Sequence, residues 1–201
     1  MMHRNFPIFQ SHLDLAHSYW EKLLKEGDWA IDATCGNGND TLKLAKILLK
    51  NGNKKQSGII GIDLQEEAIL KTKSLLQSHL SNDENSYIHL FHQSHIDFPS
   101  PAKENPIRLI VYNLGYLPGG NKQMTTMTQC SLESVKQALD LVIPGGAVCI
   151  TCYPGHEEGN REERALLNEV SKLSSLTWNV CYHTFPNRRL SASLLLIQKN
   201  C

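Results

Sequence analysis

The stretch Ala-Ile-Asp-Ala-Thr-Cys-Gly-Asn-Gly-Asn-Asp-Thr, residues 30–41, runs from an apolar strand through a glycine turn directly into the start of a helix. Glycine has no Cβ atom, so Gly36 and Gly38 let the main chain turn sharply and approach a ligand closely. The helix that begins near Asp40 leaves its first backbone N–H groups without partners inside the helix. Because α/β proteins hold nucleotide-like cofactors at such junctions, this stretch predicts a cofactor site.

A second acidic residue follows at a spacing that suits a ribose. The predicted strand 58–63 ends in Asp63, some 25 residues beyond Gly38, where a carboxylate can accept hydrogen bonds from both ribose hydroxyls. Dinucleotide enzymes share this acid. Here, however, Thr41 stands where the third glycine of G-x-G-x-x-G would be, and Asp32 lies at the end of the preceding strand. These features favour a cofactor without a pyrophosphate, such as S-adenosylmethionine, over a nicotinamide dinucleotide.

Length and composition indicate an ordinary globular chain. The 201 residues fit one domain, residues 1–201, with a sizeable core. Hydrophobic residues make up 41% and charged residues 20%, and no apolar run approaches the roughly 20 residues that span a bilayer. The first residues lack the apolar segment of a signal peptide, so we expect a cytoplasmic protein without a membrane partner. The sequence does not determine the oligomeric state, and a homodimer is compatible with it.

Charge and cysteine usage exclude some functions. Lys and Arg number 20 against 20 Asp and Glu, which argues against broad, sequence-independent coating of nucleic acid. Six scattered cysteines lack the spacing of a disulfide framework or a zinc site, so we expect reduced thiols and no metal. Cys149 and Cys152 do form C-x-x-C, but a strand sends such a pair to opposite faces.

The order of predicted elements indicates the fold. Apolar residues at three- and four-residue steps predict an amphipathic helix over about residues 12–26, ended by Gly27, which we expect to pack across the sheet edge or the cofactor mouth. Strands and helices then alternate, which indicates a parallel sheet covered on both faces, and the connection 186–189 is so short that the last two strands must pair antiparallel. We expect strands over 29–33, 58–63, 87–92, 107–113, 147–153, 178–185 and 193–199, helices over 40–50, 66–80, 126–141 and about 161–173, and a loop over 81–86.

The predicted fold class is therefore α/β: a mostly parallel seven-stranded sheet with a C-terminal antiparallel hairpin, the Rossmann-like arrangement of class I methyltransferases. Ligands bind such sheets outside the carboxyl ends of the strands where the strand order reverses, which here brings together the ends of the first, second and fourth strands. The candidate cofactor-binding residues are Asp32, Cys35, Gly36, Asn37, Gly38, Asn39, Asp40, Thr41, Asp63, Leu64, Gln65, Gln93, Ser94, His95 and Asn113.

Individual roles follow from the position of each residue. Asp63 would hold the ribose, with Leu64 and Gln65 beside the sugar and base. Asp32 and Asp40 would lie near the methionine ammonium, whose positive charge a carboxylate offsets. For Asp40 the alternative is a helix N-terminal residue favoured by the helix dipole. Residues 93–95 would meet adenine or, alternatively, form a solvated loop.

The segment Asn-Leu-Gly-Tyr, residues 113–116, is similar to the Asn/Asp-Pro-Pro-Tyr element of methyltransferases that modify an exocyclic or side-chain nitrogen. Methyl transfer is an in-line displacement, so the amine must be neutral with its lone pair aimed at the methyl group. The Asn113 side-chain oxygen and the Leu114 carbonyl can arrange this by accepting its hydrogens. Tyr116 can stack on a planar base. The alternative is a loop that only turns the chain.

Further candidates follow the fifth strand and line the predicted rim. His156 can serve as the proton acceptor because histidine titrates near working pH, although an exposed loop histidine or proton loss to water is the alternative. Basic side chains on the rim offer phosphate contacts, or else form a solvated face. These basic residues are Lys122, Arg161, Arg164, Arg188 and Arg189.

Four segments together resemble the rRNA methylase family, whose members look like tRNA 5-aminomethyl-2-thiouridine methyltransferases. They are residues 32–41, Gly-Ile-Asp-Leu-Gln at 61–65, Asn-Leu-Gly-Tyr-Leu-Pro-Gly-Gly at 113–120 with Thr125 and Thr126, and Tyr-Pro-Gly-His at 153–156. The similarity spans residues 16–199, and the 113–120 string is its most specific part. Two positions depart from the family pattern: Asn39 stands where many relatives have histidine, and Pro154 interrupts Tyr-x-Gly-His.

The resemblance, and not the periodicity, implies the substrate. It implies transfer of a methyl group from S-adenosylmethionine to the aminomethyl nitrogen of a modified wobble uridine, with the anticodon region of tRNA as partner. Base methylation of rRNA is the alternative enzyme reaction, since Asn113 would serve either substrate. A protein that binds the cofactor and RNA without catalysis is the alternative from another functional class.

Overall fold

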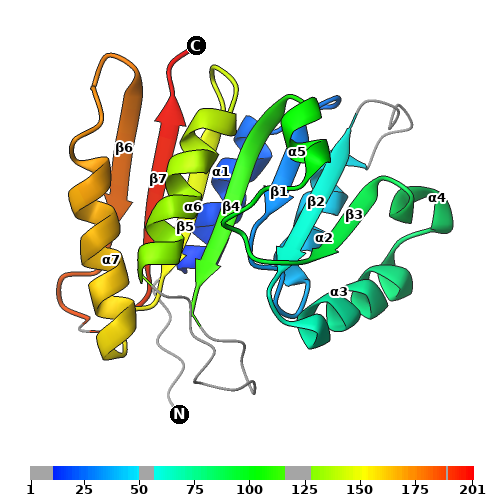
Figure 1. The fold of residues 1–201 in the computed structure, drawn as a ribbon, viewed down its shortest axis with the longest axis horizontal. Helices are drawn as coiled ribbons and strands as arrows, with labels where there is room; N and C mark the ends of the chain where they lie inside the picture. The colour runs from blue at the N-terminus through cyan, green and yellow to red at the C-terminus, as the bar shows by residue number, and fades with distance from the viewer. Residues whose placement is uncertain (1–10, 50–56, 116–127, 189) are drawn as a thin grey trace.

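The computed structural model describes residues 11–49, 57–115, 128–188 and 190–201, which form a central sheet with helices on both faces (Figure 1). Within these residues the sheet has seven strands in the order β3-β2-β1-β4-β5-β7-β6. The strands are β1 (Trp29–Asp32), β2 (Gly58–Asp63), β3 (Ile88–His92), β4 (Ile107–Leu114), β5 (Ala147–Cys152), β6 (Trp178–His183) and β7 (Ser193–Lys199). This confirms the predicted fold class.

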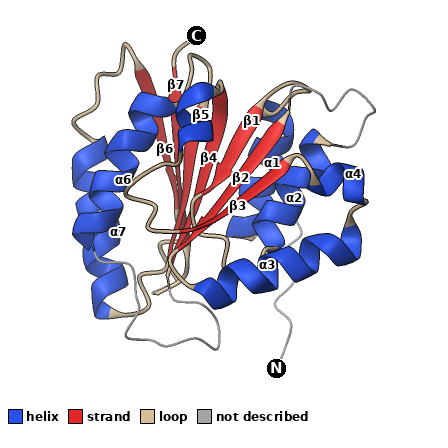
Figure 2. Cartoon of the chain, turned by 45° about the vertical axis from the view of Figure 1, so that its right-hand side comes forward, coloured by secondary structure: helices blue, strands red, loops and turns tan. Residues whose placement is uncertain are grey.

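Helices lie in two layers on either side of the sheet (Figure 2). Helices α1 and α2 pack on one face, with α3 against α2, while α6 and α7 pack together on the other face. The helices are α1 (His12–Leu23), α2 (Asn39–Leu48), α3 (Glu66–His79), α4 (Asn82–Asn85), α5 (Ser100–Glu104), α6 (Thr128–Leu141) and α7 (Glu157–Val170). None of these helices is long and apolar enough to cross a lipid bilayer.

The strand directions place the reversal of strand order at β1 and β4. Strands β1 to β5 pair in parallel, with β2 and β3 on one side of β1 and with β4 and β5 on the other. Strand β7 enters antiparallel between β5 and β6, and it pairs with both. The carboxyl ends of β1, β2 and β4 therefore meet at one edge of the sheet, as the sequence predicts.

Two apolar clusters hold the layers together, one on each face of the sheet. The central strands read as continuous apolar runs because both of their faces are covered. On the α1 and α2 face, the cluster includes Ala16 and Trp20 of α1, which are 0% and 3% exposed. Helix α1 is thus a packed part of the core, and its position is set by burial of its apolar stripe.

Several bounds differ from the predictions by one to four residues, and α5 was not predicted. Helix α1 ends at Leu23 rather than near residue 26, because Leu24 is extended and the backbone N–H of Lys25 donates to the Asp28 carboxylate. Helix α7 begins at Glu157, four residues before the predicted start, because His156 caps it. The expected loop 81–86 contains α4, which Ser81 and Glu84 close with a reciprocal capping box.

Candidate functional site

The turn between β1 and α2 has the conformation that its glycines predict. Gly36 and Gly38 have φ angles of 54° and 82°, the left-handed region that favours glycine, and Gly38 is the N-cap of α2. A Cβ atom on Gly38 would lie 2.8 Å from the Cα of Thr72 in α3. Gly38 is therefore required both by its backbone conformation and by the close approach of α3.

Asp63 at the end of β2 fixes this turn. One carboxylate oxygen accepts the N–H of Gly36 at 2.9 Å, and the other accepts the N–H of Gln65 at 2.9 Å. A carboxylate oxygen has two acceptor positions, so each oxygen keeps capacity for a further donor. The neighbouring Leu64 is 57% exposed, which leaves an apolar side chain beside the carboxylate. The structure thus brings Asp63, Leu64 and Gln65 together with the glycine turn.

Asp32 at the end of β1 is fully buried, at 0% exposure. Its oxygens accept the hydroxyl of Thr41 at 2.6 Å and the N–H of Thr34 at 3.2 Å. Burial, followed by the nearby charge of Asp40, raises the pKa of Asp32 to about 7. Thr41 is itself buried, so the residue that replaces the third glycine is a hydrogen-bond partner of the buried acid.

The remaining predicted residues of the turn are divided between interior and surface. Cys35 is buried, and its N–H donates to the carbonyl of Ile62 at 3.0 Å, which ties the turn to β2. Burial raises the pKa of the Cys35 thiol well above its ordinary value, so this cysteine is not a reactive thiolate. Asn37 and Asn39 are exposed.

The end of β3 supplies a further polar group. The backbone N–H of Gln93 donates to the Asp63 carbonyl at 3.0 Å, and the Ser94 hydroxyl accepts the N–H of Ile96. His95 is 8% exposed and lies edge-on to Tyr112, with 5.9 Å between the ring centroids. Its Nδ1 is buried and has no hydrogen-bond partner among the described residues. Burial lowers the pKa of His95, so the ring is neutral at neutral pH.

Asn113 near the end of β4 lies in a network of side chains from four segments. Its Nδ2 donates to Asp40 Oδ2, and its Oδ1 accepts the Tyr153 hydroxyl at 3.4 Å. His17 contacts the other Asp40 oxygen at 2.8 Å, and His12 Nε2 lies 3.4 Å from the Tyr153 hydroxyl. The predicted residues Asp40 and Asn113 are therefore in direct contact.

Sequence reasoning missed three members of this network. His12 and His17 lie on α1, for which the sequence predicts a place at the sheet edge or the cofactor mouth but no site residue, and Tyr153 follows β5. The signal for Tyr153 was its place in the 153–156 segment, next to a predicted site residue. The two histidines are five residues apart on a helix near the N-terminus, and no local motif connects them to the strand ends.

His156 and the chain after β4 complete the rim. His156 is the N-cap of α7, where its Nδ1 accepts the N–H of Gly159 at 3.0 Å. A capping role through Nδ1 accounts for the early start of the helix. Leu114, whose carbonyl is a predicted acceptor, is the last residue of β4 and is buried. Tyr116, Lys122 and Arg189 lie outside the described residues.

The described basic candidates are surface residues with their own contacts. Arg161 is exposed and forms ion pairs with Glu157 at the start of α7 and, at 3.7 Å, with Glu158. The Arg188 guanidinium lies 4.4 Å from the Phe185 ring centroid, and Arg164 is exposed on α7. Among the residues that the structure covers, no cluster of three or more His, Cys, Asp or Glu could hold a metal ion.

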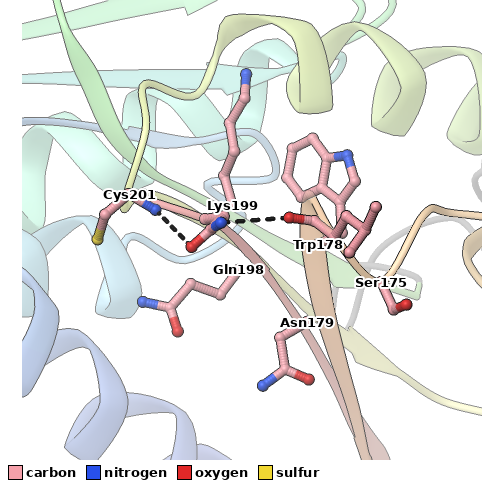
Figure 3. A pocket seen from close by; sticks show the side chains of 8 residues that line it. Ser175, Trp178, Asn179, Gln198, Lys199 and Cys201 are labelled. Atoms are coloured by element: carbon pink, nitrogen blue, oxygen red, sulfur yellow. Dashed lines mark hydrogen bonds between the residues drawn. The ribbon is translucent and has the colours of Figure 1, made fainter.

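A pocket of about 290 Å³ lies at the opposite end of the sheet, beside the start of β6 and the end of β7 (Figure 3). Its charged residue, Lys199, is already engaged: Nζ donates to the Val142 carbonyl at 2.9 Å and lies 5.3 Å from the Trp178 ring centroid. Lys199 thereby caps the carboxyl end of α6. This pocket lies away from the strand ends that hold Asp32, Asp63 and Asn113.

Known methyltransferases resemble this chain in sequence. The family model described as "Putative rRNA methylase" matches residues 59–199. The chain is 34% identical to "tRNA (mnm5s2U34)-methyltransferase, chloroplastic" of Arabidopsis thaliana over 98% of this chain and 77% of that protein.

Two solved structures are 28% identical to the chain. A putative rRNA methylase from Clostridium thermocellum superposes with a TM-score of 0.84 over 95% of this chain and 98% of that one. A putative methyltransferase from Streptococcus mutans, solved in complex with SAH, gives a TM-score of 0.77 over 95% and 99% of the two chains. By sequence match, overall fold and the arrangement of its strand ends, the chain belongs to the rRNA methylase family.

Proposed function

We propose that this protein is an S-adenosylmethionine-dependent methyltransferase that acts on the aminomethyl nitrogen of a modified wobble uridine in tRNA. The observation that carries the proposal is the meeting of Asp63, the glycine turn and Asn113 at the carboxyl ends of β2, β1 and β4. The name of the Arabidopsis relative supports tRNA as the substrate. The structure of the Streptococcus mutans protein with SAH supports the cofactor.

The residues at the strand ends fit this cofactor. Asp63 has acceptor capacity for the two ribose hydroxyls, and the Gly36 to Gly38 turn presents main chain without a Cβ barrier. The exposed Leu64 offers an apolar surface to the base. The buried Nδ1 of His95, which has no partner within the described part of the chain, offers a hydrogen-bonding group near the same strand ends. Asp32 is fully buried, so it would stabilise the methionine ammonium through its charge and not through a direct contact.

When bound, S-adenosylmethionine supplies a methyl group activated by its positive sulfur. Asn113 Oδ1 and the Leu114 carbonyl accept the two hydrogens of the neutral acceptor amine and aim its lone pair at the methyl carbon. This orientation matters because in-line displacement needs the attacking nitrogen close to, and aligned with, the bond that breaks. His156 is our candidate for taking the proton that the amine loses, which requires its Nδ1 to release the Gly159 N–H. Water is the alternative acceptor.

The charge of the site favours a cationic substrate group. Asp32 lies close enough to Asp40 and Asp63 for both of their charges to raise its pKa, so three carboxylates surround the strand ends. Ammonium and sulfonium groups are stabilised in such an acidic site. An aminomethyl group arrives as an ammonium, which these charges attract, and it loses one proton before it attacks the methyl group. The uncharged ring nitrogen of a base gains no such attraction. We therefore rank tRNA aminomethyl-uridine above rRNA base methylation.

A transfer assay with defined RNA tests the proposal. Purified protein is incubated with methyl-labelled donor and tRNA that carries 5-aminomethyl-2-thiouridine, and the nucleosides are then analysed by mass spectrometry. We expect label only on the wobble nucleoside. The matched RNA with unmodified uridine at that position should stay unlabelled, and so should rRNA. Label on an rRNA base instead would contradict the proposed substrate.

A variant separates catalysis from binding alone. Asn113→Ala removes one of the two proposed acceptors and should lower turnover at least about tenfold, which corresponds to about 1.4 kcal/mol of transition-state stabilisation. Binding of tRNA and donor should change little, because the amide contacts only one hydrogen of the tRNA amine and the donor is held mainly by Asp63 and the glycine turn. Equal binding with no turnover in either protein would favour a binding protein without catalysis.

A further inference from the structure

A chain of side-chain contacts connects helix α1 to Asn113 through Asp40. Asp40 Oδ2 accepts the side-chain N–H of Asn113, and Asp40 Oδ1 contacts His17 Nε2 at 2.8 Å. The Asp40 side chain is 10% exposed and that of His17 is 25% exposed. Both carboxylate oxygens of Asp40 are thus engaged by protein side chains from β4 and α1.

These contacts select one orientation of the Asn113 amide. A carboxylate only accepts hydrogen bonds, so Asp40 requires the nitrogen end of the amide to face it. On the other side, the Tyr153 hydroxyl donates to Oδ1 at 3.4 Å, which requires the oxygen end there. The backbone N–H of Asn113 also donates to Thr34 Oγ1 at 2.7 Å, so main chain and side chain are both fixed.

We propose that Asp40 is a positioning residue that sets the direction of the Asn113 amide, and that His17 of α1 holds Asp40 in place. The inference rests on the proposed function, because the amide oxygen is the group that accepts a hydrogen of the acceptor amine. A rotated amide would present N–H donors, which would bind the lone pair of the amine instead of its hydrogens and turn that lone pair away from the methyl group. Asp40 acts through Asn113 and does not bind the methionine ammonium.

The proposal gives α1 a role in turnover as well as in folding. His17 lies between the buried residues Ala16 and Trp20 in the sequence, and its ring is 4.7 Å from that of Trp20, centroid to centroid. Docking of the apolar stripe of α1 therefore delivers His17 to Asp40. A charge-assisted hydrogen bond of this kind is among the stronger polar contacts in proteins.

Steady-state kinetics of four variants test the proposal. Asp40→Asn removes the carboxylate, and His17→Phe removes the ring nitrogen that contacts Asp40. His17→Gln keeps an N–H donor near that place, and Asp140→Asn makes the same chemical change as Asp40→Asn on the exposed face of α6. For each protein, kcat and KM are measured with aminomethyl-uridine tRNA, and the Kd of S-adenosylmethionine is measured by calorimetry.

The expected pattern separates positioning from cofactor binding. Asp40→Asn and His17→Phe should lower kcat by about 10- to 100-fold, as a misplaced acceptor group does, with the Kd of the donor changed less than about threefold. His17→Gln should recover most of the activity, and Asp140→Asn should match the unchanged protein. If Asp40→Asn raises the Kd of S-adenosylmethionine by the same factor by which it lowers kcat/KM, Asp40 binds the cofactor and the proposal is overturned. If His17→Gln and His17→Phe lower kcat by the same factor, the proposed role of His17 is overturned.

A second readout needs no RNA and separates this proposal from the proposed function. The side-chain NH2 of Asn113 is followed by NMR hydrogen exchange, with its signal assigned by its loss in Asn113→Asp. We expect slow exchange in the unchanged protein and exchange at least about tenfold faster in Asp40→Asn and His17→Phe. This result would support the roles of Asp40 and His17 even if the protein does not methylate the tested tRNA. Exchange that is fast already in the unchanged protein would refute it. If Asp40→Asn does not fold, the two His17 variants decide alone.

Discussion

At the scale of single residues, the site rests on acids in three different environments. Asp32 is buried, Asp40 has both oxygens engaged by side chains, and Asp63 is partly exposed with backbone N–H partners. The sequence predicts Asp63 because a strand end and a fixed spacing identify it. It does not predict the contact of Asp40 with His17, because that contact depends on how α1 docks on α2.

The pKa of Asp32 leads to a pH-dependent stability. Its pKa is about 7 in the folded protein against an ordinary value of 3.8, so between these values the folded state holds a proton that the unfolded chain has lost. Stability therefore falls as pH rises from about 4 to 7, with a slope of up to about 1.4 kcal/mol per pH unit from this group. We expect Asp32→Asn to remove this contribution.

Urea unfolding at several pH values measures the contribution of Asp32 to the pH dependence of stability. The free energy of unfolding of Asp32→Asn relative to the unchanged protein should grow from pH 5 to pH 7 and level off above pH 8. The comparison uses the difference between the two proteins, since the lost hydrogen bonds to Thr41 and Thr34 add a constant offset. A difference that does not change with pH would show that Asp32 titrates near its ordinary value.

Gly38 allows a second test at this scale. Gly38→Ala would place a Cβ atom 2.8 Å from the Thr72 Cα in a residue with φ of 82°. The left-handed conformation alone costs about 1–2 kcal/mol, and the clash adds to it, so we expect a loss of at least about 2 kcal/mol in the free energy of unfolding. Gly155→Ala is the control, because its Cβ would meet only the Leu190 carbonyl at 3.8 Å. Equal stability of both variants would contradict this account of the turn.

At the scale of elements, local sequence predicts which segments form helices and strands better than where they end. Helix α3 begins and ends within one residue of its predicted bounds, because its first-turn acids and apolar period are local signals. Helix α7 starts early because His156 caps it through Nδ1, a role that serine, threonine or aspartate fills more often. The capping box of α4 was visible as Ser81 and Glu84, three residues apart.

Helix α1 supplies the element-level prediction. Trp20 is 3% exposed and packs between α2 and the sheet, so Trp20→Ala should lower the free energy of unfolding by about 3–5 kcal/mol. Because its ring also contacts His17, turnover at a temperature where the variant is folded should fall as well. Leu13→Ala, on the same helix but 36% exposed, should cost less than about 1 kcal/mol. Denaturant unfolding measures the stability of both variants, and a methyl-transfer assay measures their turnover. A folded Trp20→Ala protein with full turnover would show that the packing of α1 does not affect the site.

At the scale of the whole molecule, strand order follows from alternation of elements and from the short final connection. Burial of β1, β2, β4 and β5 on both faces explains why their apolar runs indicate a parallel sheet. The antiparallel placement of β7 between β5 and β6 agrees with the short link that precedes it. The sequence predicts that the first helix packs across the sheet edge or the cofactor mouth. It does not predict which residues of α1 meet the strand ends, since that depends on long-range packing with no local signal.

Cofactor binding should stabilise the whole fold. A ligand at about 100 times its Kd adds about 2.7 kcal/mol to the free energy of unfolding, which for a chain of this size raises Tm by roughly 5–10 °C. We expect this shift with S-adenosylmethionine and none with a nicotinamide dinucleotide, because the acids Asp32, Asp40 and Asp63 near the strand ends disfavour a negatively charged pyrophosphate. Differential scanning fluorimetry with both ligands measures it, and a shift with the dinucleotide alone would contradict the assignment.

The most direct test of the central claim is a crystal structure of the protein with S-adenosylhomocysteine. We predict that the ribose hydroxyls lie within hydrogen-bond distance of the Asp63 carboxylate and that the sulfur faces the Asn113 amide across the Gly36 to Gly38 turn. A ligand bound away from the carboxyl ends of β1, β2 and β4, or an Asn113 side chain turned from the sulfur into the packed interior, would contradict it.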